Sequence, residues 1–399
     1  IKACRGFSRH FCIVGLPPSD LTIYTMILTQ CAVCATELGL TLGKKCGRCS
    51  TRYCGPECQK THWEEGGHDQ ICKPIKRAGG AEQYNANQKY AEAVAVAAEK
   101  CAEDTKGQTC YICTQALHWK TKEGLVRMCA CRGTAGFAHV SCLAEQAKIL
   151  WEEAEERNLD EKVRHERWRR WYACSLCEQS YHGVVRCALG WACWKTYLGR
   201  SETDRARRFA MTELGTGLHD AARFEDALSA REAVLSMERR CGASQHNILI
   251  AQNNLACSYQ DVGRHEEALC LRRDVYSGRL RLDGEEHEMT LAAASNYASS
   301  LITQERFEEA KSLSRKMIPV ARRFLGESHD LTLKLRWFYA RTLYRDAGAT
   351  LGDLREAVTT VEETARTARR VMGGAHPLAR DIERTLQNAR EALAARDEA

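Results

Sequence analysis

The chain has 399 residues, more than one hydrophobic core usually organises, so we expect two or three domains. Its 22 cysteines are too clustered in C-x2-C pairs for a disulfide framework, since such clusters indicate metal ligands in a reducing compartment. The formal net charge of +6 does not indicate nucleic-acid binding, because no stripe of Lys and Arg with interleaved aromatic residues accompanies it.

Bound zinc would remove the basic surplus altogether. Zinc deprotonates its thiol ligands, so a site of four cysteines carries a charge of −2 and a site of three cysteines and one histidine carries −1. Fourteen cysteines and two histidines of the sequence stand at zinc-ligand spacing, enough for two sites of each kind, which would cancel the +6 of the bare chain. We therefore expect no nucleic-acid partner.

Residues 1–30 are expected to form an irregular leader. Their apolar stretch, FCIVGLPPSDLTIYTMILTQ, is interrupted by Pro17, Pro18 and Asp20 and is too short to span a bilayer. We expect no membrane partner and a cytoplasmic protein, with the nucleus as the alternative compartment.

Eight Cys and His residues at zinc-ligand spacing occupy residues 31–72, the first module. They form four pairs: Cys31 and Cys34, Cys46 and Cys49, Cys54 and Cys58, and His68 and Cys72. Ligands two or three residues apart can reach one ion, and structural zinc takes four ligands. The four pairs therefore predict two closed zinc sites.

Residues 73–107 are expected to form a helical linker. The stretch over 81–103, AEQYNANQKYAEAVAVAAEKCAE, is rich in Ala, Glu and Lys and contains no Gly or Pro. This composition predicts one continuous helix.

A second set of eight ligands lies within residues 108–180, the second module. Its pairs are Cys110 and Cys113, Cys129 and Cys131, His139 and Cys142, and Cys174 and Cys177. A charged stretch between the third and fourth pairs predicts a helical insertion, and residues 181–204 are expected to be a linker. Both modules together offer sixteen ligands, which predicts four zinc ions in the chain.

Residues 205–399 repeat at a period of about 42 residues. Alanines recur in E-x-A or E-A contexts with a histidine nineteen residues later: Ala227, Ala268, Ala310 and Ala357, then His246, His287, His329 and His376. Each unit predicts two amphipathic helices, which can bury their apolar faces only by stacking into a solenoid. No Cys or His partner recurs with the histidines, so we expect them at helix starts and not in metal sites.

The first module resembles a MYND zinc finger through YCGPECQKTHWEEGGHDQIC, with Pro56 at the start of a short helix. The resemblance implies a cross-brace in which Cys31, Cys34, Cys54 and Cys58 hold one zinc and Cys46, Cys49, His68 and Cys72 hold the other. It also implies a groove for proline-rich peptides lined by Gln59 and Trp63. The alternative roles are packing for Trp63 and plain exposure for Gln59.

The second module resembles a RING-CH (RING-variant) finger through CACRGTAGFAHVSCL and the single residue between Cys129 and Cys131. A PHD finger has the same ligand order, and Tyr172, two residues before Cys174, is a feature of that alternative. The RING-CH resemblance implies a second cross-brace, with Cys110, Cys113, His139 and Cys142 on one zinc and Cys129, Cys131, Cys174 and Cys177 on the other.

RING-CH fingers act as ubiquitin ligases that hold a charged ubiquitin-conjugating enzyme (E2) without a covalent ubiquitin intermediate. The resemblance implies E2 contacts at Ile112 and Leu143 and no catalytic residue. Two positions depart from the family: Gln146 stands where a tryptophan is usual, and Glu178 where a basic residue often aids transfer.

The repeats resemble tetratricopeptide repeats (TPR) of the kinesin-light-chain kind, which implies a concave surface for protein or peptide ligands. The expected fold is thus multidomain, with two small zinc-stabilised cross-brace modules followed by an all-α TPR-like solenoid. The expected function is a RING-type E3 ubiquitin ligase that recruits substrate through the repeats and the MYND finger. The alternative is a non-catalytic zinc-binding scaffold for protein interactions, because no phosphate loop, catalytic triad or open metal site is found in the sequence.

Overall fold

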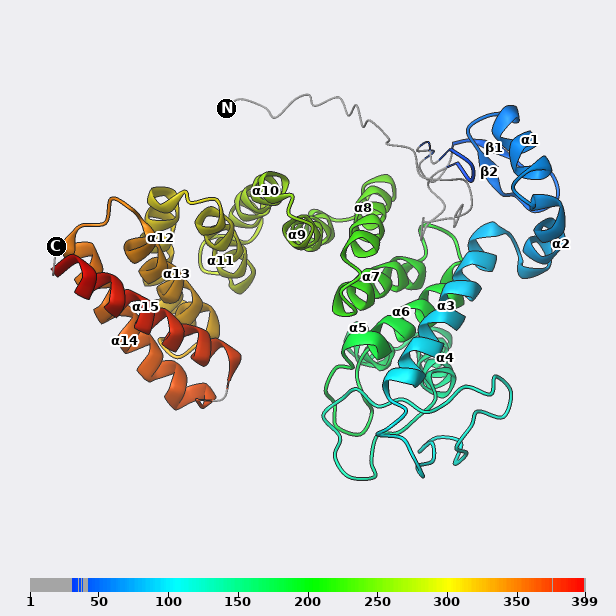
Figure 1. The fold of residues 1–399 in the computed structure, drawn as a ribbon, viewed down its shortest axis with the longest axis horizontal. Coiled ribbons are helices and arrows are strands. Elements are labelled where there is room, and N and C mark those ends of the chain that lie inside the picture. The colour runs from blue at the N-terminus through cyan, green and yellow to red at the C-terminus, as the bar shows by residue number, and fades with distance from the viewer. Residues whose placement is uncertain (1–30, 35, 37, 39–41, 375, 398–399) are drawn as a thin grey trace. The chain divides into compact units, whose positions relative to one another are not determined.

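A computed structural model describes residues 31–34, 36, 38, 42–374 and 376–397 of the chain (Figure 1). The predicted leader over residues 1–30 lies outside the described residues. The chain divides into two compact units, with the break after Gln88. Each unit is described by itself.

The described residues of the first unit form two short strands, two complete helices and the start of a third. Strand β1 (Lys44–Lys45) pairs antiparallel with β2 (Arg52–Tyr53), and helices α1 (Pro56–Glu64) and α2 (His68–Ala78) follow. Proline starts α1, where its missing N–H costs no helical hydrogen bond. Among its described residues, the buried core cluster contains, besides cysteines, the apolar side chains of Leu38, Tyr53 and Ile75. A core this small usually needs metal ions or disulfides for stability.

Helix α3 (Ala81–Lys100) occupies most of the stretch predicted to be a helical linker, and its residues lie on both sides of the unit break. Within the second unit, Tyr90, Val94 and Ala97 on α3 are buried. The Tyr90 hydroxyl lies 3.0 Å from Ser141 Oγ, and Lys195 Nζ lies 3.4 Å from the centre of the Tyr90 ring. This half of α3 is therefore part of the second module's core.

The second module continues with α4 (Val140–Glu156), α5 (Glu161–Trp168) and the short 3-10 helix η1 (Arg169–Trp171). Helices α4 and α5 are the predicted charged insertion. Asp160 caps α5 by accepting a hydrogen bond from the Val163 amide, which satisfies one of the free N–H groups of the first turn.

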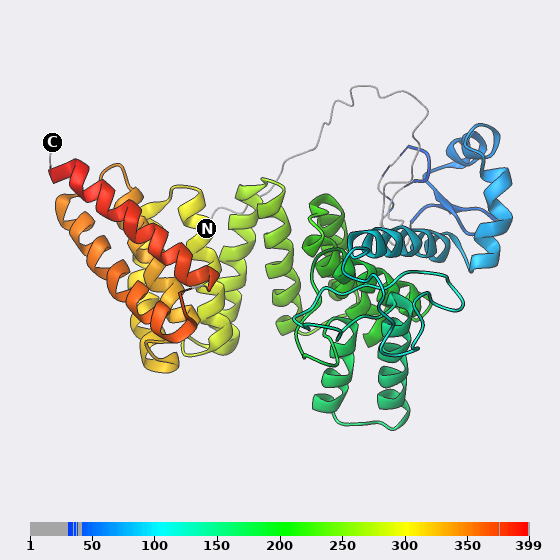
Figure 2. The same ribbon diagram turned by 60° about the horizontal axis from the view of Figure 1, so that its bottom comes forward.

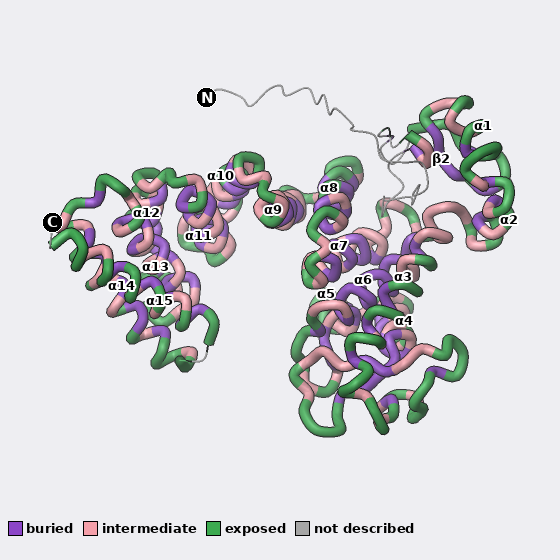
Figure 3. Tube along the Cα trace, in the orientation of Figure 1, coloured by how far each residue is buried: buried purple, intermediate pink, exposed green. Residues whose placement is uncertain are grey.

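Where the sequence predicts a linker over 181–204, the structure has helix α6 (Gly183–Tyr197), and residues 185–194 of it are all buried (Figure 3). The helix packs against α4 and, most extensively, against α7 (Arg205–Asp220). The α6–α7 approach is close enough that a Cβ on Gly217 would lie 2.6 Å from the Arg186 carbonyl oxygen. A helix covered on both sides shows no amphipathic pattern, which is why the sequence does not reveal it.

The interface between the second module and the solenoid is aromatic and charged. Trp168 packs edge-on against Trp151 and Phe209, with ring centres 4.8 and 5.4 Å apart. Glu213 on α7 accepts a hydrogen bond from Trp168 Nε1 at 3.1 Å and forms a buried ion pair with Arg186 on α6. The module and the first repeat therefore share one core.

The remaining helices pack one against the next to form the solenoid (Figure 2). They are α8 (Phe224–Arg240), α9 (Gln245–Asp261), α10 (His265–Asp283), α11 (Glu288–Thr303), α12 (Phe307–Leu325), α13 (Asp330–Arg345), α14 (Leu351–Met372) and α15 (Pro377–Asp397). The four recurring alanines are fully buried, which allows the helices to approach closely. Among the described residues, none of the helices combines the length and the apolar composition that a bilayer span requires.

All four recurring histidines lie at helix starts, as predicted: His246 lies in the first turn of α9, and the other three cap their helices. His287 and His329 are the N-cap residues of α11 and α13, and their rings accept hydrogen bonds from Met289 N and Leu331 N. The His376 ring accepts in the same way from Leu378 N. Each of these three rings satisfies a free N–H group of its own helix.

Candidate metal centres and interaction surfaces

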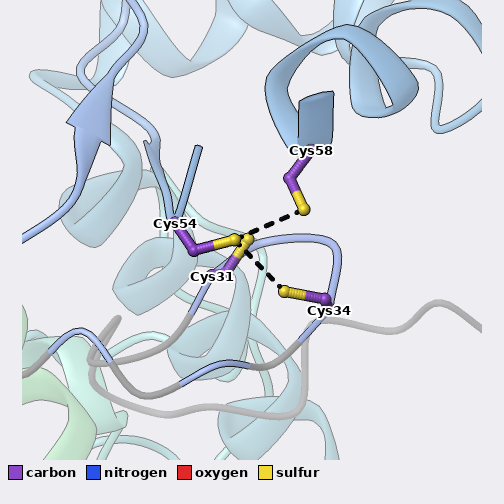
Figure 4. Close-up of side chains that lie close together, drawn as sticks. All are labelled: Cys31, Cys34, Cys54 and Cys58. Carbon is purple, nitrogen blue, oxygen red and sulfur yellow. Dashed lines mark hydrogen bonds between the residues drawn. The ribbon is translucent and has the colours of Figure 1, made fainter. Parts of the chain in front are cut away.

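Sixteen Cys and His side chains gather in four clusters of four, and in each cluster the candidate ligand atoms lie within 4.8 Å of one another. The clusters are Cys31, Cys34, Cys54 and Cys58; Cys46, Cys49, His68 and Cys72; Cys110, Cys113, His139 and Cys142; and Cys129, Cys131, Cys174 and Cys177. In each module the first pair meets the third and the second meets the fourth, which is the connectivity of a cross-brace. Figure 4 shows the thiols of the first cluster pointing toward one another.

The spacing within the clusters fits zinc. A tetrahedral zinc ion with bonds of about 2.3 Å to sulfur and about 2.05 Å to nitrogen sets S···S distances of about 3.8 Å and S···N distances of about 3.6 Å. Cys34 and Cys54 Sγ are 3.4 Å apart, and Cys131 and Cys174 Sγ are 3.7 Å apart. Cys49 Sγ lies 3.3 Å from His68 Nε2.

Local structure brings the ligands of the first module together. His68 and Cys72 lie four residues apart on α2 and so share one face of the helix. Cys58 lies in the first turn of α1. The Thr36 hydroxyl, 3.0 Å from Cys34 Sγ, stabilises the thiolate and lowers the pKa of Cys34 to about 6, which prepares it to bind a cation.

His139 presents a lone pair to its cluster. Its Nε2–H donates to the Ala116 carbonyl at 3.3 Å, which leaves Nδ1 unprotonated in the neutral ring. That atom lies 3.4 Å from Cys113 Sγ and 3.6 Å from Cys142 Sγ. Burial lowers the pKa of His139 and so favours the neutral form that metals bind.

Two C-x2-C turns of the second module lie side by side with the same geometry. The Ile112 amide donates to Cys110 Sγ and the Leu176 amide to Cys174 Sγ, each at 3.4 Å. The Tyr111 hydroxyl lies 3.0 Å from Ser175 Oγ and joins the turns. Ile112 and Leu176 are 37% and 52% exposed, so two apolar side chains stand on neighbouring turns.

The other implied E2 contact, Leu143, is only 3% exposed. It follows Cys142 on the inner face of α4, where it packs into the core, so it does not form the contact surface that the resemblance implies. Leu176 was missed in the sequence, although it holds the place in its C-x2-C turn that Ile112 holds in the first turn.

The two departures from the RING-CH pattern occupy different environments. Gln146 is half-buried on α4. Glu178 accepts two hydrogen bonds from Arg170 Nη2, at 2.7 and 2.9 Å, which lower the pKa of its carboxyl group. The Arg170 Nη1 donates to the Cys174 carbonyl at 3.1 Å, so this guanidinium is held against the fourth cluster.

In the first module, Trp63 on α1 is 44% exposed, and its ring lies edge-on to His68 at 5.8 Å between centres. Gln59, one turn earlier, is partly exposed. Both can be reached by a ligand.

The solenoid has a hollow of about 260 Å³ between α9, α10 and α11. Its walls include the apolar side chains of Leu249, Val275 and Met289. Asn253 and Asn296 also line it, and Asn296 Nδ2 donates to Asn253 Oδ1 at 3.0 Å across two repeats. This site could not be predicted from sequence, because its residues belong to three helices that meet only in the folded chain.

The comparisons match two parts of the chain. Residues 31–72 match the MYND finger family, and residues 290–330 match a tetratricopeptide repeat family. The second match covers most of α11 and all of α12. No curated protein matches the chain.

Several solved structures are similar to part of this chain. A Podosopora anserina kinesin light chain with nearly identical TPR-like repeats is 18% identical over 58% of this chain and 97% of its own, with a TM-score of 0.41. BtubC (BKLC) from P. vanneervenii is 12% identical over 65% of this chain and 90% of its own, with a TM-score of 0.39. The TPR2AB domain of yeast Sti1 in complex with pHSP90 is 11% identical over 62% of this chain and 99% of its own, with a TM-score of 0.22.

The predicted MYND finger and tetratricopeptide repeats are confirmed by these family matches, and so is the predicted fold class. The Cys and His clusters are those of a zinc-binding protein. The chain therefore consists of a small N-terminal zinc-binding MYND finger, with a further Cys/His module behind it, followed by an all-helical TPR-like solenoid.

Proposed function

We propose that this protein is a zinc-binding scaffold that holds other proteins through its solenoid and its zinc modules. The observation that carries the proposal is the hollow between α9, α10 and α11, which combines an apolar floor with amide side chains. Ligand sites typically join a mainly apolar surface to a few convergent polar groups. The Cys/His clusters complement this role, because none of the four leaves a ligand position open for a substrate.

Each of the four clusters is assigned one zinc ion. The two clusters of the first module and the two of the second would each supply four protein ligands, which is the coordination of structural zinc. Bound zinc supplies a cross-link between distant segments of a module that has little core of its own. Four ions per chain is the stoichiometry that metal analysis of the native protein should find.

The hollow suits an uncharged, extended segment with one aliphatic side chain. Leu249 and Val275 offer apolar contact, while Asn253 and Asn296 can hydrogen-bond to the peptide backbone. Arg279 also lines the hollow, but its guanidinium lies 3.2 Å from the Asp283 carboxylate, which neutralises it. An acidic ligand would therefore find little compensation there.

A peptide display selection on the full, zinc-loaded chain tests this function. We expect enriched peptides to share one aliphatic residue in an uncharged context. Asn296→Ala should weaken their binding about tenfold, the worth of one or two hydrogen bonds. Ala292→Trp should abolish binding by filling the hollow, whereas Asn388→Ala on α15 should change nothing. Peptides that bind the Ala292→Trp variant as well as the parent would contradict the assignment.

A ubiquitin ligase is the second candidate, and the exposed pair Ile112 and Leu176 favours it. Two apolar side chains on neighbouring zinc turns could hold an E2 without any covalent step. Glu178 counts against it, because an acid that is paired with Arg170 follows Cys177 where a basic residue often aids transfer. The scaffold is therefore the better-supported function.

Autoubiquitination with a broad panel of E2 enzymes separates the two candidates. If the chain is a ligase, Ile112→Ala should cut ubiquitin transfer at least tenfold while zinc content stays unchanged. Leu282→Ala, which removes an exposed apolar side chain from α10, is the matched control. No transfer by the unchanged protein with any E2 would leave the scaffold as the function.

A further inference from the structure

The loop between Cys113 and Gly124 exposes two large apolar side chains at its tip. Leu117 is 59% exposed and Trp119 is 69% exposed. Exposed aromatic and aliphatic side chains this close together commonly mark an interaction site. Neither residue belongs to a metal cluster or to the Ile112 and Leu176 pair.

The tip is held firmly by the residue between them. His118 is buried, its ring lies edge-on to His139 at 5.3 Å, and its Nδ1 accepts a hydrogen bond from the Thr121 amide at 3.2 Å. The His118 amide donates to the Glu123 carbonyl at 3.0 Å, and the Lys122 amide donates to the His118 carbonyl at 2.9 Å. Because His118 points inward, its neighbours Leu117 and Trp119 point outward from a fixed turn.

The exposed charged side chains of this loop are all positive. Lys120 and Lys122 are exposed. The one acid at the end of the loop, Glu123, faces inward and accepts hydrogen bonds from Ser141 N at 2.7 Å and Ser141 Oγ at 3.0 Å. The tip over residues 117–122 therefore carries only apolar, neutral and positively charged side chains.

We propose that this tip inserts into an anionic lipid surface. Tryptophan prefers the boundary between headgroups and acyl chains, leucine can enter the acyl region, and the two lysines would meet anionic headgroups. A protruding tip suits a soft, flat surface, which needs no matching pocket. The expectation of no membrane partner rested on the lack of a spanning segment, and contact with the interface requires none. The role goes beyond the proposed scaffold function, since it gives the scaffold a place to act.

Co-sedimentation of the full, zinc-loaded chain with lipid vesicles tests the proposal. Vesicles of about one part phosphatidylserine to three parts phosphatidylcholine should bind the protein at low ionic strength, and pure phosphatidylcholine vesicles should bind it at least about thirtyfold more weakly. The double variant with Leu117→Ser and Trp119→Ser should lose at least tenfold in partition on the anionic vesicles. The double variant with Lys120→Gln and Lys122→Gln should lose about thirtyfold on them and show no change on the neutral vesicles.

Two matched controls keep the result specific. Leu282→Ser removes an exposed apolar side chain from α10, and the double variant with Arg366→Gln and Arg370→Gln removes the same charge from α14; both should bind like the parent. Zinc content should be the same in every variant. Full sedimentation by either loop variant would overturn the proposal. Failure of the parent to bind anionic vesicles would also overturn it. In that case a pocket on an acidic protein would be the remaining binding partner for the tip.

Discussion

Replacing Cys174 with serine is expected to unfold the second module and to release both of its zinc ions. Cys174 is fully buried in a cluster of four thiols, so its loss leaves three ligands around an ion that needs four. Zinc in such sites contributes about 10–16 kcal/mol to folding, which exceeds the whole stability of most domains. The damage should spread, because Trp171, three residues earlier, is buried against Tyr197 of α6 with ring centres 5.6 Å apart.

Native mass spectrometry and thermal unfolding measure this effect. We expect two zinc ions in place of four and the loss of the second module's unfolding transition. Cys257→Ser is the matched control, since Cys257 is a half-buried cysteine of α9 outside every cluster, and it should retain all zinc. Four ions bound to the Cys174→Ser variant would contradict the assignment of this cluster.

Replacing Gly217 with alanine is expected to destabilise the solenoid start by about 2–4 kcal/mol. The new Cβ would lie 2.6 Å from the Arg186 carbonyl oxygen and 3.0 Å from Cys187 Cα. Both are backbone atoms, so no side-chain rotation relieves the overlap and α6 must move away from α7. That movement would also strain the buried ion pair between Arg186 and Glu213.

Urea unfolding followed by circular dichroism measures the loss. The control is Gly352→Ala in α14, where the nearest atom to the new Cβ is Thr350 Oγ1 at 3.6 Å, an ordinary contact. Alanine is the better helix former by about 1 kcal/mol, so this control should be neutral or slightly more stable than the parent. A Gly217→Ala variant as stable as the parent would show that α6 and α7 do not approach as closely as described.

Short-range spacing made the metal clusters predictable, since residues two to four apart on a turn or helix must lie together. Spacing does not show which ligand pairs, distant in sequence, share one zinc ion. That grouping was implied by the resemblance to MYND and RING-CH fingers, and the four clusters in the structure contain the same residues. The repeat was predictable for a similar reason, because every unit has an alanine and a histidine at the positions that Ala268 and His287 occupy in theirs.

Other features depended on packing that no single segment encodes. The stretch that became α6 is apolar on every side, and with Gly190 inside it the sequence offered no helical periodicity. Leu143 and Leu176 both lie beside zinc ligands, yet their environments differ. Leu143 lies on the buried face of α4, whereas Leu176 lies in a C-x2-C turn and is exposed to solvent. Asn253 and Asn296 meet only because two repeats stack in register.

The shared core of α4, α6 and α7 has a consequence for how the chain is made. Synthesis proceeds from the N-terminus, so the ligands of the second module leave the ribosome before α6 and α7 do. Trp168 and Trp171 therefore lack their packing partners on α6 and α7 until residues up to about Asp220 have emerged. Once α7 packs on these tryptophans, each later helix pair can pack on the folded repeat that precedes it, because repeats contact only their neighbours. We therefore expect that a shortage of zinc during translation leaves the second module incomplete, with Trp168 and Trp171 exposed for chaperones to bind.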